Sequence, residues 1–184
     1  MKIWKLELDV NNYEALWPVS ERRMELAEKQ TFDGRSKIAE WTIMETQRPD
    51  QDNPPLPFGN VASFYTLFPA FDDKALDVLS YMMKGAVEIL PLDFEGVLWY
   101  GVYTTRVLDA LDLEKSECVL FSSGRIMRIA KYVFMPELIS DIHIFKIPED
   151  PLFNQLVSDE YKIRAEEAGL TGFRFILVWD SEAT

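Results

Sequence analysis

The single histidine of the chain, His143, is the first residue to examine for chemistry. A hydrolase would use it as a general base beside a hydroxyl or thiol nucleophile. The candidate nucleophiles are Ser140, Ser158 and Cys118. No Gly-x-Ser-x-Gly motif supports this assignment. The pattern predicts a strand over residues 142–147, in which His143 shares an apolar face with Phe145 and Ile147, and this favours a structural histidine.

Metal and cofactor sites find no support in the spacing of ligand residues. One histidine and one cysteine cannot build a zinc site of the usual ligation. The acidic pairs lack the graded spacing of a calcium loop and are better explained as helix caps and solvated turns. The eight glycines are scattered and form no phosphate-binding loop. We therefore expect neither a metal nor a cofactor.

Charge gives a further indication about partners. Nineteen basic and 31 acidic side chains give the chain a formal charge of −12, most of it in residues 61–184. This charge repels nucleic acids and anionic membranes but attracts a basic protein. Solubility alone is the plainer explanation of the same charge. Predicted turns should expose these acidic candidates for partner binding: Asp93, Glu95, Asp109, Asp112, Glu114, Glu149 and Asp150.

Residues 1–60 give weaker structural signals than the rest of the chain. Alternation over residues 4–10 predicts a half-buried strand, and residues 37–44 are a second candidate strand. Residues 20–29 resemble a short helix. Four prolines make residues 47–59 a loop. This loop marks residues 1–60 as a candidate N-terminal lobe beside a core of residues 61–184, within one domain of residues 1–184.

Two helices are expected in the core. The clearer one covers residues 73–84, between an Asp72 cap and Gly85. Its predicted buried residues are Leu76, Leu79 and Met83. The second covers residues 159–168 and ends at Gly169.

Strands account for most of the remaining core. The predicted segments are 86–90, stopped by Pro91; 97–102, central in the sheet; a hairpin around residues 122–125; 142–147; and 173–179, where Phe173, Phe175, Leu177 and Trp179 share a face. Few helices and at least one hairpin predict an α+β fold with a mixed, largely antiparallel sheet. Four aromatic residues in predicted loops are interface candidates: Trp17, Phe58, Phe64 and Phe94.

Location follows from two absences in the sequence. The N-terminus lacks the apolar stretch of a signal peptide, and no run is long enough to span a bilayer. A single cysteine fits a reducing compartment. We therefore expect a cytoplasmic protein.

Six short motifs follow one another through the last two-thirds of the chain. They are Ala75-Leu76, Ile89–Leu92, Leu111–Ser116, Ile144–Ile147, Val157–Glu160 and Gly169–Phe175. Their order and spacing resemble the immunity-eleven family of bacterial polymorphic-toxin immunity proteins. The resemblance covers residues 72–179 well and the N-terminal range 1–60 loosely.

The resemblance implies a non-catalytic bacterial immunity protein that binds and neutralises a cognate toxin domain, for which a nuclease is one candidate. Such a protein needs a complementary surface and no reactive residues, and a basic toxin site would suit the acidic surface. Two alternatives remain open: a small hydrolase or isomerase with an unrecognised carboxylate site, and a homo-oligomeric scaffold that uses its aromatic residues. The sequence does not determine the oligomeric state.

Overall fold

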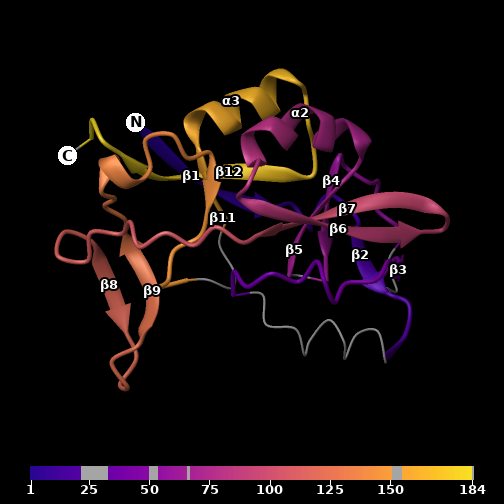
Figure 1. The fold of residues 1–184 in the computed structure, drawn as a ribbon, viewed down its shortest axis with the longest axis horizontal. Helices are drawn as coiled ribbons and strands as arrows, with labels where there is room; N and C mark the ends of the chain where they lie inside the picture. The colour runs from indigo at the N-terminus through magenta and orange to yellow at the C-terminus, as the bar shows by residue number, and fades with distance from the viewer. Residues whose placement is uncertain (22–32, 50–53, 66, 151–154, 184) are drawn as a thin grey trace.

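The computed structural model describes residues 1–21, 33–49, 54–65, 67–150 and 155–183 (Figure 1). The elements before the central hairpin are β1 (Lys2–Leu8), β2 (Ala15–Pro18), β3 (Met44–Gln47), β4 (Val61–Phe64), β5 (Phe68–Phe71) and α2 (Asp73–Met83). The later elements are β6 (Val87–Phe94), β7 (Val97–Thr104), β8 (Glu117–Leu120), β9 (Ile126–Lys131), the 3₁₀ turn η1 (Pro136–Leu138), β10 (Ile144–Phe145), β11 (Gln155–Ser158), α3 (Asp159–Glu167) and β12 (Phe173–Asp180).

Six short strands close into a small barrel at one end of the molecule. Their order is β2-β3-β6-β7-β5-β4, with parallel pairing between β2 and β4 and between β3 and β6. Bulky side chains fill the interior, among them Phe64, Phe68 and Trp99. Gly101 on β7 makes this packing possible, because a Cβ there would lie 2.6 Å from the Phe68 ring. The barrel is therefore a packed core in its own right.

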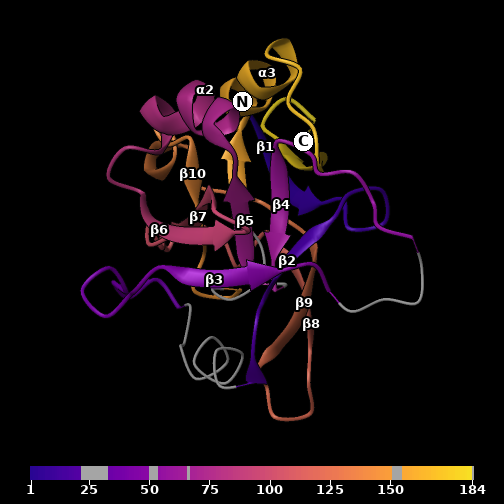
Figure 2. The same cartoon turned by 90° about the vertical axis from the view of Figure 1, so that its right-hand side faces the viewer.

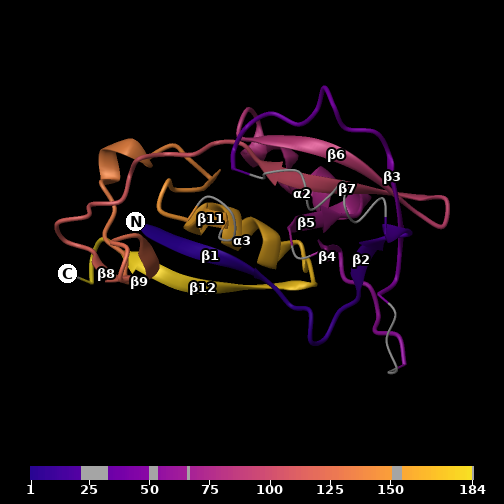
Figure 3. The same cartoon turned by 90° about the horizontal axis from the view of Figure 1, so that it is seen from below.

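The second sheet is four-stranded and antiparallel, in the order β10-β11-β1-β12. Its long strands β1 and β12 lie side by side (Figure 3). An irregularity in their pairing places Ile3 opposite Trp179 but Trp4 opposite Leu177, which leaves Val178 as an extra residue. The bulge turns Trp179 to the opposite face from Leu177. The prediction that Trp179 shares the face of Phe173 is therefore wrong.

Helices α2 and α3 lie side by side on one face of the molecule (Figures 1 and 2). Both begin as capping rules predict: Asp72 accepts a hydrogen bond from the Ala75 N–H at 2.8 Å, and Ser158 accepts one from the Tyr161 N–H at 3.2 Å. The buried residues of α2 include Leu79 and Met83, as expected, whereas Leu76 is only partly buried. The helices share a hydrophobic cluster with strands of both sheets.

Strands β8 and β9 form a separate two-stranded ribbon that projects from the body (Figures 1 and 2). We call residues 117–131 the ribbon. Gly124 has φ +83° in its turn, so the hairpin prediction is confirmed. At its base, Phe134 packs edge-on against Trp179 with ring centroids 5.7 Å apart. Ile129 of β9 also packs against this cluster, so the ribbon contacts the body near its base and its turn projects away.

Several sequence predictions about strands need correction. Residues 37–44 contain a turn, and β3 begins only at Met44. Pro91 does not stop its strand, because β3 pairs with β6 only from Leu92 onward and leaves one side of β6 open at the proline. Residues 142–147 contain only a two-residue strand. The candidate helix at 20–29 lies largely outside the described residues.

The α+β prediction holds in coarse form, since helices and mixed and antiparallel sheets are present, but strands dominate the fold. The closed barrel was not foreseen. No helix in the described part of the chain is long and apolar enough to cross a membrane.

Candidate functional site

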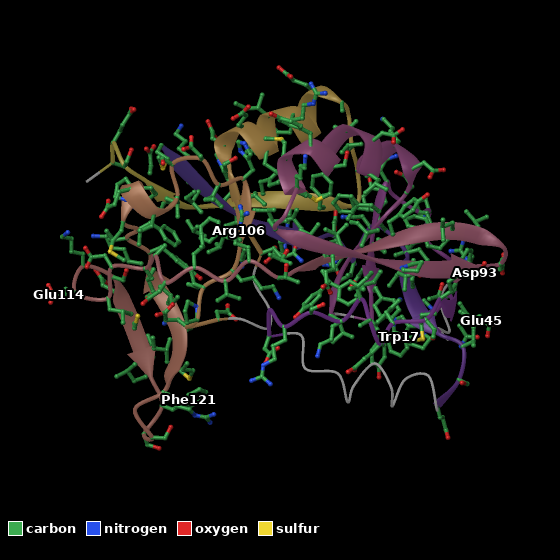
Figure 4. The ribbon with its side chains drawn as sticks, in the orientation of Figure 1. Trp17, Glu45, Asp93, Arg106, Glu114 and Phe121 are labelled. Atoms are coloured by element: carbon green, nitrogen blue, oxygen red, sulfur yellow. The ribbon has the colours of Figure 1, made fainter. Side chains whose placement is uncertain are left out.

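The seven acidic candidates do not form one surface. Asp93 and Glu95 lie at the β6–β7 turn, at the barrel end of the molecule, whereas Glu114 lies at the opposite end, near the ribbon (Figure 4). Asp109 and Asp112 belong to the loop between β7 and the ribbon, whereas Glu149 and Asp150 follow β10 in its connection to β11. The structure therefore divides the predicted site into two regions that have to be judged separately.

At the barrel end, strand register brings together residues that are far apart in the sequence. Glu45 of β3 lies opposite Asp93 of β6, and Leu98 of β7 lies opposite Asp93 on the other side. Residues directly opposite each other in a sheet share a face, so these three side chains point away from the barrel core. Figure 4 shows Glu45 and Asp93 together at this end. Glu45 was missed because the sequence prediction ended its strand at residue 44.

Two exposed apolar residues flank the same turn: Leu98 shares the face of Asp93, whereas Val97 lies opposite Phe94 on the other face. Val97 is 58% exposed and Leu98 is 44% exposed, although both lie in a strand. We call Glu45, Asp93, Glu95, Val97 and Leu98 the barrel-end surface. An exposed apolar group rimmed by charges is typical of protein-binding surfaces.

The barrel-end carboxylates are not neutralised locally. Like charges placed opposite each other across strands destabilise a sheet. Within the described residues, no basic side chain forms an ion pair with Glu45, Asp93 or Glu95. Asp93 Oδ1 accepts a hydrogen bond from the Gly96 N–H at 3.1 Å, which fixes the turn and leaves its charge in place. A cationic partner would therefore meet carboxylates that no basic side chain in the described part of the chain already pairs.

Near the ribbon, the acidic residues have structural partners. Asp112 forms an ion pair with Lys115, with 2.7 Å between Oδ2 and Nζ. The hydrogen bond from Lys115 lowers the pKa of the Asp112 carboxyl, although partial burial opposes it. Asp112 Oδ1 also accepts from the Lys115 backbone N–H. Its charge therefore stabilises the turn, whereas Asp109 and Glu114, the other predicted acids of this loop, are exposed.

Glu149 and Asp150 lie closer to the interior than the sequence suggested. Burial, with the nearby Asp109 charge as a smaller cause, raises the pKa of the Glu149 carboxyl. Its Oε2 atom is buried without a hydrogen-bond partner. Asp150 acts electrostatically on Lys146, a lysine only 1% exposed. Both acids are half-buried, so they offer little free surface to a partner.

Lys146 is the least expected buried residue of the chain. Its Nζ lies 6.0 Å from the centroid of the Tyr103 ring, at the junction between the barrel and the second sheet. Burial lowers the pKa of Lys146 to about 8, and the charge of Asp150 opposes that effect. The apolar residues around it indicate a buried segment, but a charged side chain in such a run is expected to reach solvent, so the sequence does not predict its burial.

His143 lies in the bend before β10, half-buried beside a cavity of about 360 Å³. Its Nδ1 is 3.0 Å from Ser158 Oγ and 3.8 Å from Glu160 Oε2. A catalytic triad needs the serine and the acid on opposite ring nitrogens, but here both approach the same nitrogen. Ser158 also caps α3. The cluster therefore anchors the start of a helix, and the expected strand position of His143 is corrected.

Two of the four aromatic interface candidates are buried. Phe64 and Phe94 are 0% and 8% exposed because both belong to the barrel core. Phe58 packs against Phe94 and lies under the guanidinium of Arg48 at 4.5 Å. Trp17 is partly exposed beside Tyr65 (Figure 4). Phe58 lies in a loop as predicted, whereas Trp17, Phe64 and Phe94 belong to strands. The strands of Trp17 and Phe64 have only four residues, too few for a periodic signal.

Metal binding has no evident site in the described residues, since no three acidic, histidine or cysteine side chains converge there.

The feature that sequence reasoning undervalued is the ribbon. Its exposed apolar residues are Leu120, Phe121 and Met127, and its exposed basic residues are Arg125, Arg128 and Lys131. The apolar residues on both sides of the Gly124 turn were the available signal.

Comparison with protein families gives one match. The family described as Immunity protein family (Imm11) matches residues 94–180, slightly less than half of the chain. This match confirms the resemblance inferred from the sequence motifs, and it supports an immunity-protein role in general terms. The matched segment contains β7, the ribbon, α3 and β12. No curated protein matches the chain.

Proposed function

We propose that this chain is an immunity protein that binds a cognate toxin domain and neutralises it without catalysis. The family match over residues 94–180 is the observation that carries this proposal. Neutralisation requires only that the protein cover the toxin's active site or hold the toxin in an inactive conformation. A cytoplasmic location accompanies this role, since the toxin must be met inside the cell that makes it.

The barrel-end surface is our proposed docking face for the toxin. Three carboxylates without ion-pair partners in the described part lie beside exposed Val97 and Leu98. Charge sets the encounter rate and the choice of partner, while the apolar residues contribute buried area. The complementary partner is a basic toxin domain, and a nuclease, with its basic substrate site, is one candidate.

The N-terminal part of the chain belongs to the same proposed unit. β1 pairs with both β11 and β12, which lie within the family-matched segment. β2 and β3 close the barrel that contains β7. We therefore propose one domain over residues 1–184, in which the N-terminal part supplies Glu45 to the docking face.

The decisive experiment is co-expression with the product of the adjacent gene, followed by co-purification and a growth-protection assay. A stable complex supports the proposed function. The double variant Glu45→Lys with Asp93→Lys should then slow association at low salt by roughly tenfold. The matched control is Asp109→Lys with Glu114→Lys, which makes the same charge change at the other end of the molecule.

Three outcomes are informative. Loss of association in the barrel-end variant alone supports both the function and the docking face. An equal loss of association in both variants would mean that the acidic charge steers the toxin generally and that the barrel end is not a specific docking face. No complex with the adjacent gene product, and no protection, would contradict the immunity role.

A further inference from the structure

The ribbon has a composition unlike the rest of the chain. Residues 117–131 contain three basic side chains and one acidic one, in a protein with a net charge of −12. The single acid, Glu117, lies opposite Lys131 across the ribbon. Arg125 lies over the Phe121 ring, 6.0 Å from its centroid, and Arg128 is exposed. The ribbon is therefore a basic feature on an acidic protein.

The ribbon tip is also apolar. Leu120 is 54% exposed, Phe121 is 48% exposed and Met127 is 49% exposed. Figure 4 shows Phe121 at the far end of the ribbon, away from the body. In the described structure β8 and β9 pair only with each other. An isolated two-stranded ribbon is marginally stable, so three large exposed apolar residues on it indicate a surface that another molecule covers.

The barrel-end surface has the complementary character. It presents carboxylates at Glu45, Asp93 and Glu95 beside the exposed apolar Val97 and Leu98. The two surfaces lie at opposite ends of the molecule, so they cannot meet within one chain (Figure 4). They can meet between two chains, where the ribbon of one copy reaches the barrel end of the next.

We propose that this protein associates with a second copy of itself head to tail, with the ribbon tip of one copy docked on the barrel-end surface of another. Charge complementarity selects this arrangement: a ribbon-to-ribbon contact would set basic groups against each other, and a contact between two barrel ends would set acids against acids. The contact joins two different surfaces, so it produces a ring or an open chain. The contact uses the surface that we propose as the docking face for the toxin, so a second copy and the toxin would compete for it. Self-association is therefore tested on the protein without toxin.

A charge-swap experiment on the full-length chain tests this arrangement. Sedimentation velocity over a concentration series at low salt should show association that weakens as salt rises, because exposed charges are screened. Arg125→Glu with Arg128→Glu, or Glu45→Lys with Asp93→Lys, should each weaken association by roughly tenfold or more. Lys74→Glu with Lys84→Glu on exposed positions around α2 is the control, since it makes the same charge change as the ribbon variant.

Mixing the two end variants gives the sharpest readout. The ribbon variant then offers an acidic tip to the basic barrel end of the other variant, while the unmodified ribbon and barrel end also match. The mixture should associate at concentrations where each variant alone stays monomeric. A thermal melt of each variant separates loss of contact from loss of folding, and Phe121→Ser, which changes no charge, should weaken association as well.

Clear results would overturn the proposal. The proposal is wrong if the wild-type protein remains monomeric at every concentration and salt tested. It is also wrong if both end variants associate as strongly as the wild type. Failure of the folded mixture to associate would reject this pairing of surfaces. Ribbon-dependent binding to anionic lipid vesicles by a monomeric protein would assign the tip to a membrane surface instead.

Discussion

The barrel end and the ribbon end of this molecule are both built from short strands, but they differ in how far their apolar side chains are buried. The barrel closes six strands around a packed aromatic interior, so its edges are paired and its interior apolar side chains are buried. The ribbon has only two strands and leaves Leu120, Phe121 and Met127 half-exposed. Apolar side chains inside the barrel therefore stabilise the fold, whereas those on the ribbon remain available for contacts.

The largest expected difference concerns stability. Phe64→Ala in the barrel should lower the free energy of unfolding by about 3–5 kcal/mol, because Phe64 is fully buried between Phe68 and Trp41. Phe121→Ala at the ribbon tip should change it by less than about 0.5 kcal/mol. Chemical denaturation of both variants measures the contrast. Equal losses would mean that the ribbon is part of the cooperative core.

The junction between the two ends should show a pH dependence that arises from Lys146. Its pKa of about 8 in the folded state lies below the ordinary value of 10.5, so the unfolded chain binds more protons between these values. The free energy of unfolding should therefore rise with pH from about 8 to 10.5, by up to about 3 kcal/mol. Lys146→Met should remove this rise and leave the protein at least as stable at pH 7. Denaturation midpoints measured across this pH range test the prediction. If the free energy of unfolding still rises with pH in Lys146→Met, the pH dependence arises from other groups.

The cluster at the start of α3 should matter for stability and not for activity. Ser158→Ala removes a helix cap and should cost about 1 kcal/mol, and His143→Ala should cost no more. Neither variant should alter binding to the toxin or protection against it. A folded His143→Ala protein that had lost protection, or any measured turnover, would revive the hydrolase alternative.

The smallest effect is expected at the acidic turn near the ribbon. Reversing Asp109, Asp112 and Glu114 to lysine should change toxin association less than the barrel-end variant does, since the Asp112 charge is already paired with Lys115. Association rates measured across a salt series give the comparison. A larger effect from this triple variant would move the docking face from the barrel to the ribbon base.

Much of the local structure was predictable from short-range rules. The α2 boundaries followed from Asp72 and Gly85, and Gly169 predicted the end of α3, because caps and left-handed residues act within one turn. The Ser158 cap of α3 was not predicted. The hairpin turn at Gly124 followed for the same reason. Strands of two to four residues were placed poorly, since they contain too little alternation to reveal a face.

The candidate site was predicted only in part, for reasons of register. Asp93 and Glu95 were identified as exposed turn acids, but their neighbour Glu45 depends on parallel pairing between β3 and β6, which lie far apart in the sequence. Glu149 was expected at the surface, yet folding half-buries the residue and encloses its Oε2 atom. Local rules give no information about such distant neighbours.

The sequence alone therefore determined the acidic charge, the capped helices, the strand-rich α+β class and the family resemblance, since each depends on composition or on neighbours along the chain. The tertiary structure decided that six short strands close into a barrel, that Trp179 turns to the other sheet face and that Lys146 is buried. It also placed acidic and basic apolar surfaces at opposite ends. The reason is physical: the closure of a sheet, a bulge and the charge of a surface are set by contacts between distant segments, which no local pattern specifies.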